Sequence, residues 1–216
     1  MLRILYQMPN AIQRLYGGVV WRLPNKEDGE KTIYLTFDDG PVPEVTPPVL
    51  DILDRYAVKA TFFMVGENIL KHPELAREVL RRGHSVGNHT FNHLKGTAKG
   101  VKEYIDNVEQ TDALLDNIHP MGHSRQRLLR PPYGKMKFAQ KRLLAQTHRL
   151  ILWDVITHDY NKDYSPEKVL QVVKRYSRDG SIVVFHDSIK ASRNVLAVLP
   201  KAIEYWLEQG YRLQVI

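Results

Sequence analysis

Short apolar runs alternate along the chain with longer segments whose apolar residues recur at helical spacing. The short runs are typical of buried strands, and the longer segments are typical of amphipathic helices. The predicted strands cover residues 32–36, 60–64, 85–86, 128–129, 150–153, 181–185 and 212–216. The predicted helices cover residues 47–56, 73–82, 102–116, 138–146, 166–176 and 195–209. This alternation predicts a parallel sheet with helical crossovers.

Glycine and proline mark the ends of several predicted helices. Gly83 and Gly210 follow two of them, and Pro166 begins a third directly after Ser165, a candidate N-cap. The chain has no repeat and no low-complexity segment, so no linker indicates a second folded domain. We therefore expect one domain over residues 30–216, preceded by an N-terminal extension over residues 1–29.

Polar residues follow directly after the predicted strands. They are Asp38, Asp39, His89, Arg130, the segment 154–159, His186 and Asp187. In a (β/α) barrel the carboxyl ends of all strands meet at one mouth, where active sites are built. A doubly wound sheet would gather only some of these ends. The pattern therefore favours an α/β fold, a distorted, TIM-barrel-like (β/α) barrel of about seven strands.

Two motifs predict a metal site. In TFDDGP, residues 36–41, one of two adjacent carboxylates could hold a metal while the other faces the substrate, although Asp-Gly-Pro also suits a plain turn. In HTFNH, His89 and His93 lie four positions apart, so one turn would place both imidazoles on the same side. Nine histidines make some chance pairing expected. Because the chain has no cysteine, any metal must be bound by His, Asp or Glu.

Three further motifs follow predicted strands. RPPYG, residues 130–134, contains two prolines that fix a rigid turn and present Arg130 and the backbone N–H of Tyr133 to the mouth. WDVITHDY covers residues 153–160, and IVVFHD covers residues 182–187. A single histidine at a strand end, such as His186, is more often structural than catalytic. Its functional interpretation depends on the other motifs.

Together the five motifs, in this order and spacing, resemble the polysaccharide deacetylase family that shares the NodB homology domain, carbohydrate esterase family 4. The resemblance extends from about residue 30 to the end of the chain. It implies a distorted barrel for residues 30–216. It also implies a metal-dependent hydrolase that removes N-acetyl groups from a chitin-like or peptidoglycan-like N-acetylglucosamine polymer or oligosaccharide. The implied cofactor is a divalent ion, Zn²⁺, with Co²⁺ or Ni²⁺ as alternatives.

The resemblance also implies a role for each matching residue. The metal ligands would be Asp39, His89 and His93. The catalytic group would be Asp38 as general base, Arg130 holding Asp38, His186 as general acid, and Asp159 tethering His186. The substrate and oxyanion contacts would be the backbone N–H of Tyr133 and an acetyl-methyl pocket lined by Tyr160 and Val184. The chain departs from the family where Trp, an acid and Leu are common, with Tyr160, Ile156 and Val184 respectively, which bears on substrate preference.

Two alternative functions use the same residues. An esterase acting on O-acetyl groups of xylan could work with the same site, because an alkoxide leaves more easily than an amine. A catalytically silent carbohydrate-binding protein would normally have lost a ligand or the base, whereas every candidate residue is present here.

The net charge of +7 comes from lysines and arginines that are scattered among acids, without a basic run or a nucleic-acid-binding motif. The expected partner is therefore an acetylated carbohydrate and no nucleic acid, with weak membrane or cell-wall association left open. Residues 1–29 lack the unbroken apolar stretch of a signal peptide or membrane span. They carry only a weak amphipathic stripe of Leu5, Ile12, Leu15 and Val19. A cytoplasmic or cell-envelope location and the oligomeric state both stay open.

Overall fold

The computed structural model describes residues 6–15, 17–24, 29–119 and 126–216. Its strands are β1 (Thr32–Asp38), β2 (Thr61–Met64), β3 (Ser85–Asn88), β4 (Arg127–Leu129), β5 (His148–Leu150), β6 (Val155–Ile156), β7 (Ser181–His186) and β8 (Arg212–Leu213). Its α-helices are α1 (Asn10–Leu15), α2 (Thr46–Arg55), α3 (Gly66–Lys71), α4 (Pro73–Arg81), α5 (Val101–Ile118), α6 (Phe138–Leu144), α7 (Pro166–Tyr176) and α8 (Ser192–Glu208). Two short 3₁₀ helices, η1 (Gly96–Ala98) and η2 (Pro132–Gly134), complete the described elements.

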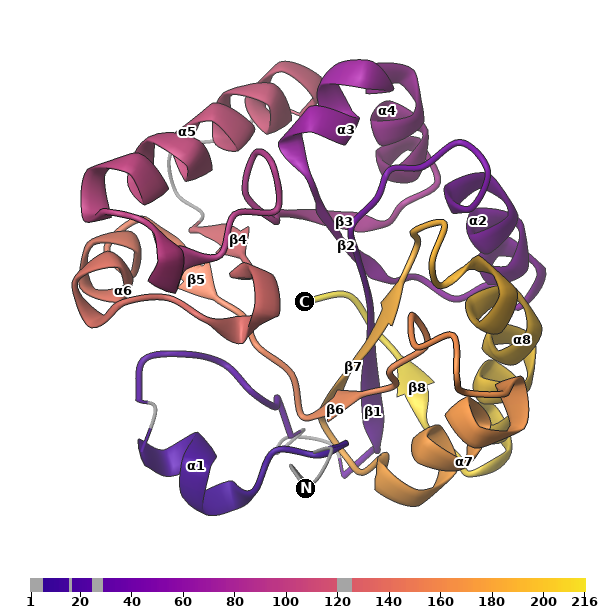
Figure 1. The fold of residues 1–216 in the computed structure, drawn as a ribbon. Coiled ribbons are helices and arrows are strands. Elements are labelled where there is room, and N and C mark those ends of the chain that lie inside the picture. The colour runs from indigo at the N-terminus through magenta and orange to yellow at the C-terminus, as the bar shows by residue number, and fades with distance from the viewer. Residues whose placement is uncertain (1–5, 16, 25–28, 120–125) are drawn as a thin grey trace.

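All strand pairs are parallel, and seven strands form the path β5-β4-β3-β2-β1-β7-β6, with β8 added beside β1. The sheet curls around a central axis with helices α2 to α8 outside it (Figure 1). Within the described chain, the end strands β5 and β6 do not pair with each other, so the barrel is open on that side. The prediction of a distorted (β/α) barrel of about seven strands is confirmed.

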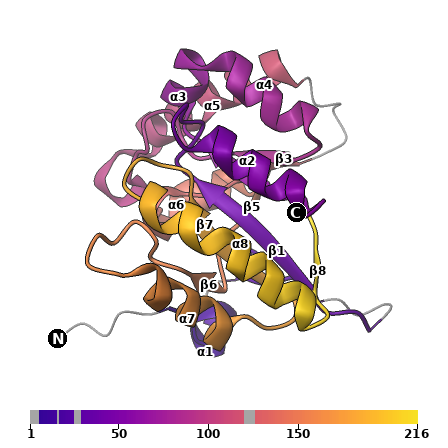
Figure 2. The same ribbon diagram turned by 90° about the vertical axis from the view of Figure 1, so that its right-hand side faces the viewer.

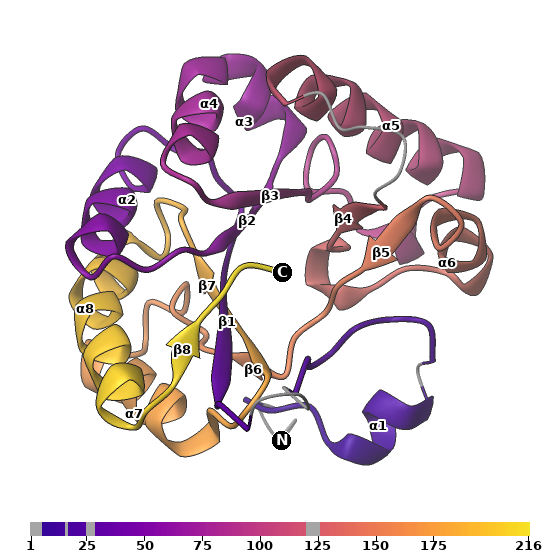
Figure 3. The same cartoon turned by 180° about the vertical axis from the view of Figure 1, so that it is seen from behind.

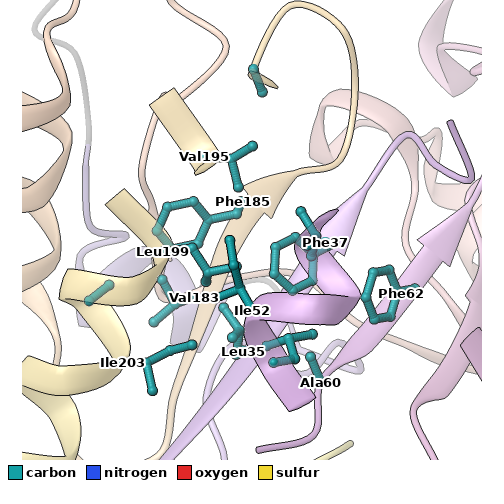
Figure 4. Close-up of a cluster of buried hydrophobic side chains, with 14 of the residues drawn as sticks. Leu35, Phe37, Ile52, Ala60, Phe62, Val183, Phe185, Val195, Leu199 and Ile203 are labelled. Carbon is teal, nitrogen blue, oxygen red and sulfur yellow. The ribbon is translucent and has the colours of Figure 1, made fainter. Parts of the chain in front are cut away.

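The hydrophobic core lies between the outer face of the sheet and helices α2 and α8. Alternate residues of each strand point outward, and Phe37 of β1 stacks on Phe62 of β2 at 4.9 Å between ring centroids. Figure 4 shows the outward set packed against the helices, with Leu35, Phe37, Val183 and Phe185 from strands, Ile52 from α2, and Leu199 and Ile203 from α8. Burial of each such side chain contributes about 1.5–3 kcal/mol, and Figure 2 shows α2 and α8 lying across β1.

The opposite faces of the same strands line the interior of the barrel. By alternation Thr36 and Asp38 of β1 point inward, as do Val184 and His186 of β7. At the amino end of the strands the interior is closed by the last residue of the chain. Ile216 packs beside a small apolar cluster of Phe63, Ile151 and Ile182, and Figure 3 shows the C-terminus near the centre of the strand ring. The polar inward residues therefore gather at the other, carboxyl end.

The predicted strand over residues 150–153 is wrong. The structure has β5 ending at Leu150 and β6 beginning at Val155, and the apolar residues between them form a crossing segment instead. That segment pairs with the N-terminal region, since the N–H of Val20 donates to Leu150 O and the N–H of Leu152 donates to Val20 O. Apolar content therefore identified burial correctly but not a single strand. Helix α3 was not predicted because six residues are too few for a clear period.

The described part of residues 1–29 lies against the barrel. The N–H of Ile156 donates to Tyr6 O and the N–H of Met8 donates to Asp154 O, so this segment runs beside β6. Leu5 and the side chain of Leu15, two members of the predicted amphipathic stripe, lie outside the described residues. Within the described chain, no helix is both long and apolar enough to cross a membrane.

Candidate active site and metal centre

Asp39, His89 and His93 come together at the carboxyl ends of β1 and β3. Each offers one ligand atom, and these atoms all lie within 4.8 Å of one another. Asp39 Oδ1 is 3.4 Å from Nε2 of His93 and 3.7 Å from Nε2 of His89. One carboxylate and two imidazoles form a donor set typical of catalytic zinc sites, which use three protein ligands and keep a further position open.

The local backbone is bent to bring these side chains inward. Asp39 has φ 83° and His93 has φ 55°, a left-handed conformation that costs non-glycine residues about 1–3 kcal/mol and clusters at functional sites. Side chains support the histidine loop, because Asn88 Oδ1 accepts from the N–H of Thr90 at 2.7 Å. Thr90 Oγ1 in turn accepts from the N–H of Leu94 at 2.8 Å. The turn between the two histidines is therefore held by its own polar residues.

His89 is oriented by a backbone carbonyl. Its Nδ1 lies 2.8 Å from Arg130 O, and because a carbonyl only accepts, Nδ1 carries the proton and Nε2 faces Asp39 with its lone pair. Burial lowers the pKa of His89 to about 3, against the opposing effect of the Asp39 carboxylate. The imidazole is therefore neutral at physiological pH, which is the form that binds metals.

Asp39 has an unsatisfied oxygen in this cluster. Among the described residues, its Oδ1 is buried and has no hydrogen-bond partner. A buried carboxylate oxygen without a partner is costly unless a cation or a donor satisfies it. The oxygen faces the two imidazole nitrogens described above, so the residues fit a divalent metal ion at this position.

Beside the cluster, Asp38 is held by a buried arginine. Nη1 of Arg130 donates to Asp38 Oδ1 at 2.5 Å and to Thr36 Oγ1 at 2.8 Å, and Nη2 donates to Leu152 O at 3.1 Å. The guanidinium also lies over the ring of Phe63 at 4.0 Å. Asp38 Oδ2 lies 3.9 Å from Nε2 of His89 and has no hydrogen-bond partner among the described residues. One oxygen of Asp38 is thus fixed, and the other faces the metal cluster.

His186 occupies the neighbouring strand position, directly across from Asp38 in the β1–β7 register. Its Nδ1 is 2.7 Å from Asp159 Oδ1, and its backbone N–H donates to Asp159 Oδ2 at 2.8 Å. Burial lowers the pKa of His186, but the charge and hydrogen bond of Asp159, together with the charges of Asp39 and Asp38, raise it to about 9. The imidazole is therefore a cation at neutral pH and can donate a proton.

A model of the polysaccharide deacetylase family matches residues 25–150 of the chain. The chain belongs to the polysaccharide deacetylase family. It is 33% identical over 202 residues to a peptidoglycan-N-acetylglucosamine deacetylase of Bacillus cereus, covering 91% of this chain and 90% of that protein. It is also 33% identical, over 88% of its length, to the peptidoglycan-N-acetylmuramic acid deacetylase PdaC of Bacillus subtilis, but spans only 40% of that longer protein.

A solved structure supports the same assignment. The peptidoglycan N-acetylglucosamine deacetylase Bc1960 superposes with a TM-score of 0.85 at 28% identity, covering 97% of this chain and 95% of that one. The present chain is accordingly a carbohydrate deacetylase of the hydrolase class, with the NodB-type barrel. The ten residues assigned from the sequence motifs keep their individual roles as predictions.

The three predicted substrate and oxyanion contacts of this deacetylase lie around the same mouth. The ring of Tyr133 stands edge-on to His93 at 4.8 Å between centroids and is 58% exposed. The ring of Tyr160 stands edge-on to His186 at 4.8 Å. Val184 is fully buried on β7, two positions before His186 and paired with Thr36. All ten predicted residues therefore surround one end of the barrel.

One residue of the deacetylase site was seen in the sequence only as a polar residue at a strand end. The buried Asp187 accepts from the N–H of Gly40 at 3.0 Å and from Thr46 Oγ1 at 2.6 Å. A Cβ atom added to Gly40 would lie 1.9 Å from the Asp187 carboxylate, so this position of TFDDGP must be glycine. Burial first, and then the Asp39 charge, raise the pKa of Asp187 to about 7. The Asp-His pair of IVVFHD was a signal of the position but not of this contact.

Proposed function

We propose that this chain is a metal-dependent deacetylase that removes N-acetyl groups from an N-acetylglucosamine-containing polysaccharide or oligosaccharide of the peptidoglycan or chitin type. The observation that carries the proposal is the pair of carboxylate oxygens without hydrogen bonds, Asp38 Oδ2 and Asp39 Oδ1, beside two imidazole nitrogens. Such an arrangement suits a cation and a base acting on the same water. Relatives that act on peptidoglycan N-acetyl sugars support the choice of substrate.

Amide hydrolysis needs an activated water, a stabilised oxyanion and a proton for the departing amine. A divalent ion on Asp39, His89 and His93 would supply a Lewis acid and lower the pKa of water. In the proposed mechanism Asp38 Oδ2 removes the proton from the attacking water, while Arg130 keeps the carboxylate ionised and oriented. The backbone N–H of Tyr133 donates to the oxyanion. His186 then donates its proton to the leaving nitrogen, and Asp159 maintains the imidazolium.

We propose Zn²⁺ as the ion in this site. Imidazole and carboxylate ligands bind Zn²⁺ at a three-residue site with an open position. Co²⁺ and Ni²⁺ accept the same ligands, and selection among the three depends on geometry and availability more than on raw affinity. Replacement of Zn²⁺ by Co²⁺ is therefore expected to retain activity.

The test is acetate release by the purified chain after metal removal by a chelator. Zn²⁺, Co²⁺ or no metal is added back, with chitooligosaccharide, peptidoglycan and acetylated xylan as separate substrates. We expect release from an N-acetylated substrate only with added metal. Metal bound at one equivalent without release from any substrate would support a silent carbohydrate-binding protein, and release from xylan alone would support an O-acetyl esterase.

A ligand variant identifies the metal site within the same experiment. His93→Ala should lower the affinity for Zn²⁺ by more than the roughly 10- to 100-fold expected for loss of an outer-shell partner. His119→Ala is the matched control, because His119 is exposed and follows α5, away from the cluster. Equal zinc content in the two variants after dialysis would show that His93 is not a ligand.

A further inference from the structure

A groove of about 490 Å³ lies beside the candidate metal centre, and its lining includes His93 and Tyr133 of the site. The same lining includes Asn92 and two lysines, Lys95 and Lys135, but no acidic residue. His93 thus belongs both to the metal cluster and to the wall of this groove. A substrate whose acetyl group reaches the metal would extend into the groove next to it.

The two lysines come from basic segments that are locked together. Residues 95–102 contain three lysines and residues 135–142 contain three lysines and an arginine, with no acid in either segment. The fully buried Gln140 joins them, because its Nε2 donates to Gly96 O at 2.9 Å while its Oε1 accepts from the N–H of Lys137 at 2.7 Å. A Cβ atom on Gly96 would lie 2.9 Å from Lys135 O, so the two segments are in close contact. The lysine-bearing wall is therefore a fixed part of the fold.

The charges of Lys95 and Lys135 are not compensated. Two other lysines of the same region are neutralised along α5 and its start, Lys99 by Glu103 at 2.7 Å and Lys102 by Asp106 at 2.6 Å. Across the ranges that the structure describes, neither Lys95 nor Lys135 forms an ion pair with an acid. Two ammonium groups with a free charge, facing one groove, attract an anion in that groove.

The mouth itself would repel the same anion. Asp38, Asp39, Asp159 and Asp187 are all at or beside it, so an anionic substituent on the sugar being deacetylated would meet like charges there. An anion on a neighbouring sugar would instead meet the lysines. The separation of charge between mouth and groove therefore favours one direction of a charged glycan chain across the site.

We propose that this groove binds an anionic oxygen group, a carboxylate or a phosphate, on the sugar next to the one that is deacetylated. The proposal rests on the proposed deacetylase function and narrows it, because it makes the substrate an acidic glycan in place of a neutral one. The lysines act through charge on the position of the glycan and take no part in the bond-breaking step.

The test compares the wild type with Lys95→Gln/Lys135→Gln in steady-state acetate release. The three substrates are a neutral N-acetylglucosamine oligomer, a glycan of the same length with a carboxylate on alternate sugars, and one with a phosphate there. The double variant should raise KM for a charged glycan by about 3- to 10-fold, with kcat within about twofold and the neutral oligomer unchanged, as exposed ion pairs of this kind predict. The charged glycan that shows the effect identifies the source of the anion.

Two control variants separate charge from shape. Lys71→Gln/Lys201→Gln removes the same charge at exposed positions outside the groove and should leave the KM values unchanged. Lys95→Arg/Lys135→Arg keeps the charge and should restore the preference for the charged glycan. In the wild type, the preference should weaken as salt rises from 50 to 300 mM, since mobile ions screen exposed charges over about 10 Å at 0.1 M.

Direct binding of the deacetylated glycans by calorimetry keeps the two proposals distinguishable. Tighter binding of the charged glycan by the wild type, lost in the glutamine variant, supports the groove even if no substrate is turned over. Deacetylation of all substrates with equal preference in the wild type and the glutamine variant would overturn the anion site while leaving the deacetylase function intact. An equal loss on neutral and charged glycans would also overturn it.

Discussion

The carboxyl and amino ends of the barrel strands each hold a buried aspartate paired with an arginine, and the two pairs are bonded very differently. At the amino end, Asp154 accepts from Nε and Nη2 of Arg178 at 2.8 and 2.6 Å and from Ser181 Oγ at 2.8 Å. It also accepts from Gln13 at 3.0 Å. At the carboxyl end, Asp38 has a hydrogen bond to Arg130 through one oxygen only. A buried carboxylate with all its acceptor sites filled can only hold structure, whereas an open oxygen can take a proton.

The same difference separates two histidine–aspartate pairs. His148 contacts Asp112 through Nε2 at 2.9 Å and Thr147 through Nδ1 at 2.8 Å, so both ring nitrogens are occupied. His186 contacts Asp159 through Nδ1 at 2.7 Å, and among the described residues its Nε2 has no hydrogen-bond partner. Residue type and pairing are alike in the two cases. The unoccupied nitrogen marks the pair that can exchange a proton with a substrate.

The largest expected effect comes from closing the open oxygen of Asp38. In Asp38→Asn the amide still contacts Arg130 but no longer serves as a base, so kcat for acetate release should fall about 100-fold or more. The Asp39, His89 and His93 cluster is untouched, and one equivalent of zinc should still bind. Metal content and kcat are measured on the same preparation.

Turnover near the wild-type rate by a zinc-loaded Asp38→Asn protein would remove Asp38 from the mechanism. The same substitution at the amino end, Asp154→Asn, is the matched control for the chemistry of the change.

A smaller effect is expected from Asp159→Asn, which tests the histidine pair. Asp159 raises the pKa of His186, so without it burial lowers that pKa and the imidazole loses its proton at lower pH. In the wild type, activity should fall as pH rises toward about 9, and a bound cation moves this limb lower still. In the variant, the alkaline limb of kcat should move down by about one pH unit or more, with a loss of about 10-fold at pH 8.

The control for this prediction is Asp112→Asn, which removes the partner of His148. Because His148 is outside the mouth, its variant should keep the wild-type pH profile of kcat. An unshifted alkaline limb in Asp159→Asn would mean that the proton for the leaving amine does not come from His186.

Much of the fold followed from periodicity, because the barrel is built from strands and helices with clear patterns. The runs around residues 32–36 and 181–185 became β1 and β7, whose outward residues form the core. The failure at residues 150–153 came from a tertiary contact, since Val20 takes the backbone hydrogen bonds that a neighbouring strand would supply. A pairing across about 130 residues leaves no local sequence signal.

The site was located by sequence, but its internal differences were not. Asp154 and Asp159 both follow a predicted strand within one motif, and only the resemblance to a family distinguished them. The structure separates them by what they contact, Arg178 in one case and His186 in the other. The contact of Asp187 with Gly40 and Thr46 depends on two loops meeting, so spacing along the chain could not reveal it.

The smallest expected effect on turnover comes from Asp154→Asn, which tests whether the amino-end pair is purely structural. The asparagine keeps the shape but leaves Arg178 without its charge partner. Because Arg178 is partly exposed, the loss in unfolding free energy should be about 1–3 kcal/mol, less than for a fully buried pair. The N-terminal segment should loosen as well, since Gln7 and Gln13 both donate to this carboxylate. Urea unfolding and hydrogen exchange of residues 6–13 measure the two effects, and kcat should stay within about twofold.

The pH dependence of that stability loss follows from the pKa of Asp154. Burial raises this pKa, but hydrogen bonds from Arg178 and Ser181 and the Arg178 charge lower it overall, below its ordinary 3.8. A carboxyl whose folded pKa is depressed stabilises the fold above its unfolded pKa and loses that contribution as pH falls through the folded value. The wild type should therefore exceed Asp154→Asn in unfolding free energy at pH 7 and converge on it below about pH 3.8. A fully folded Asp154→Asn protein that had lost turnover would instead connect the amino-end pair to catalysis and erase the distinction between the two ends of the barrel.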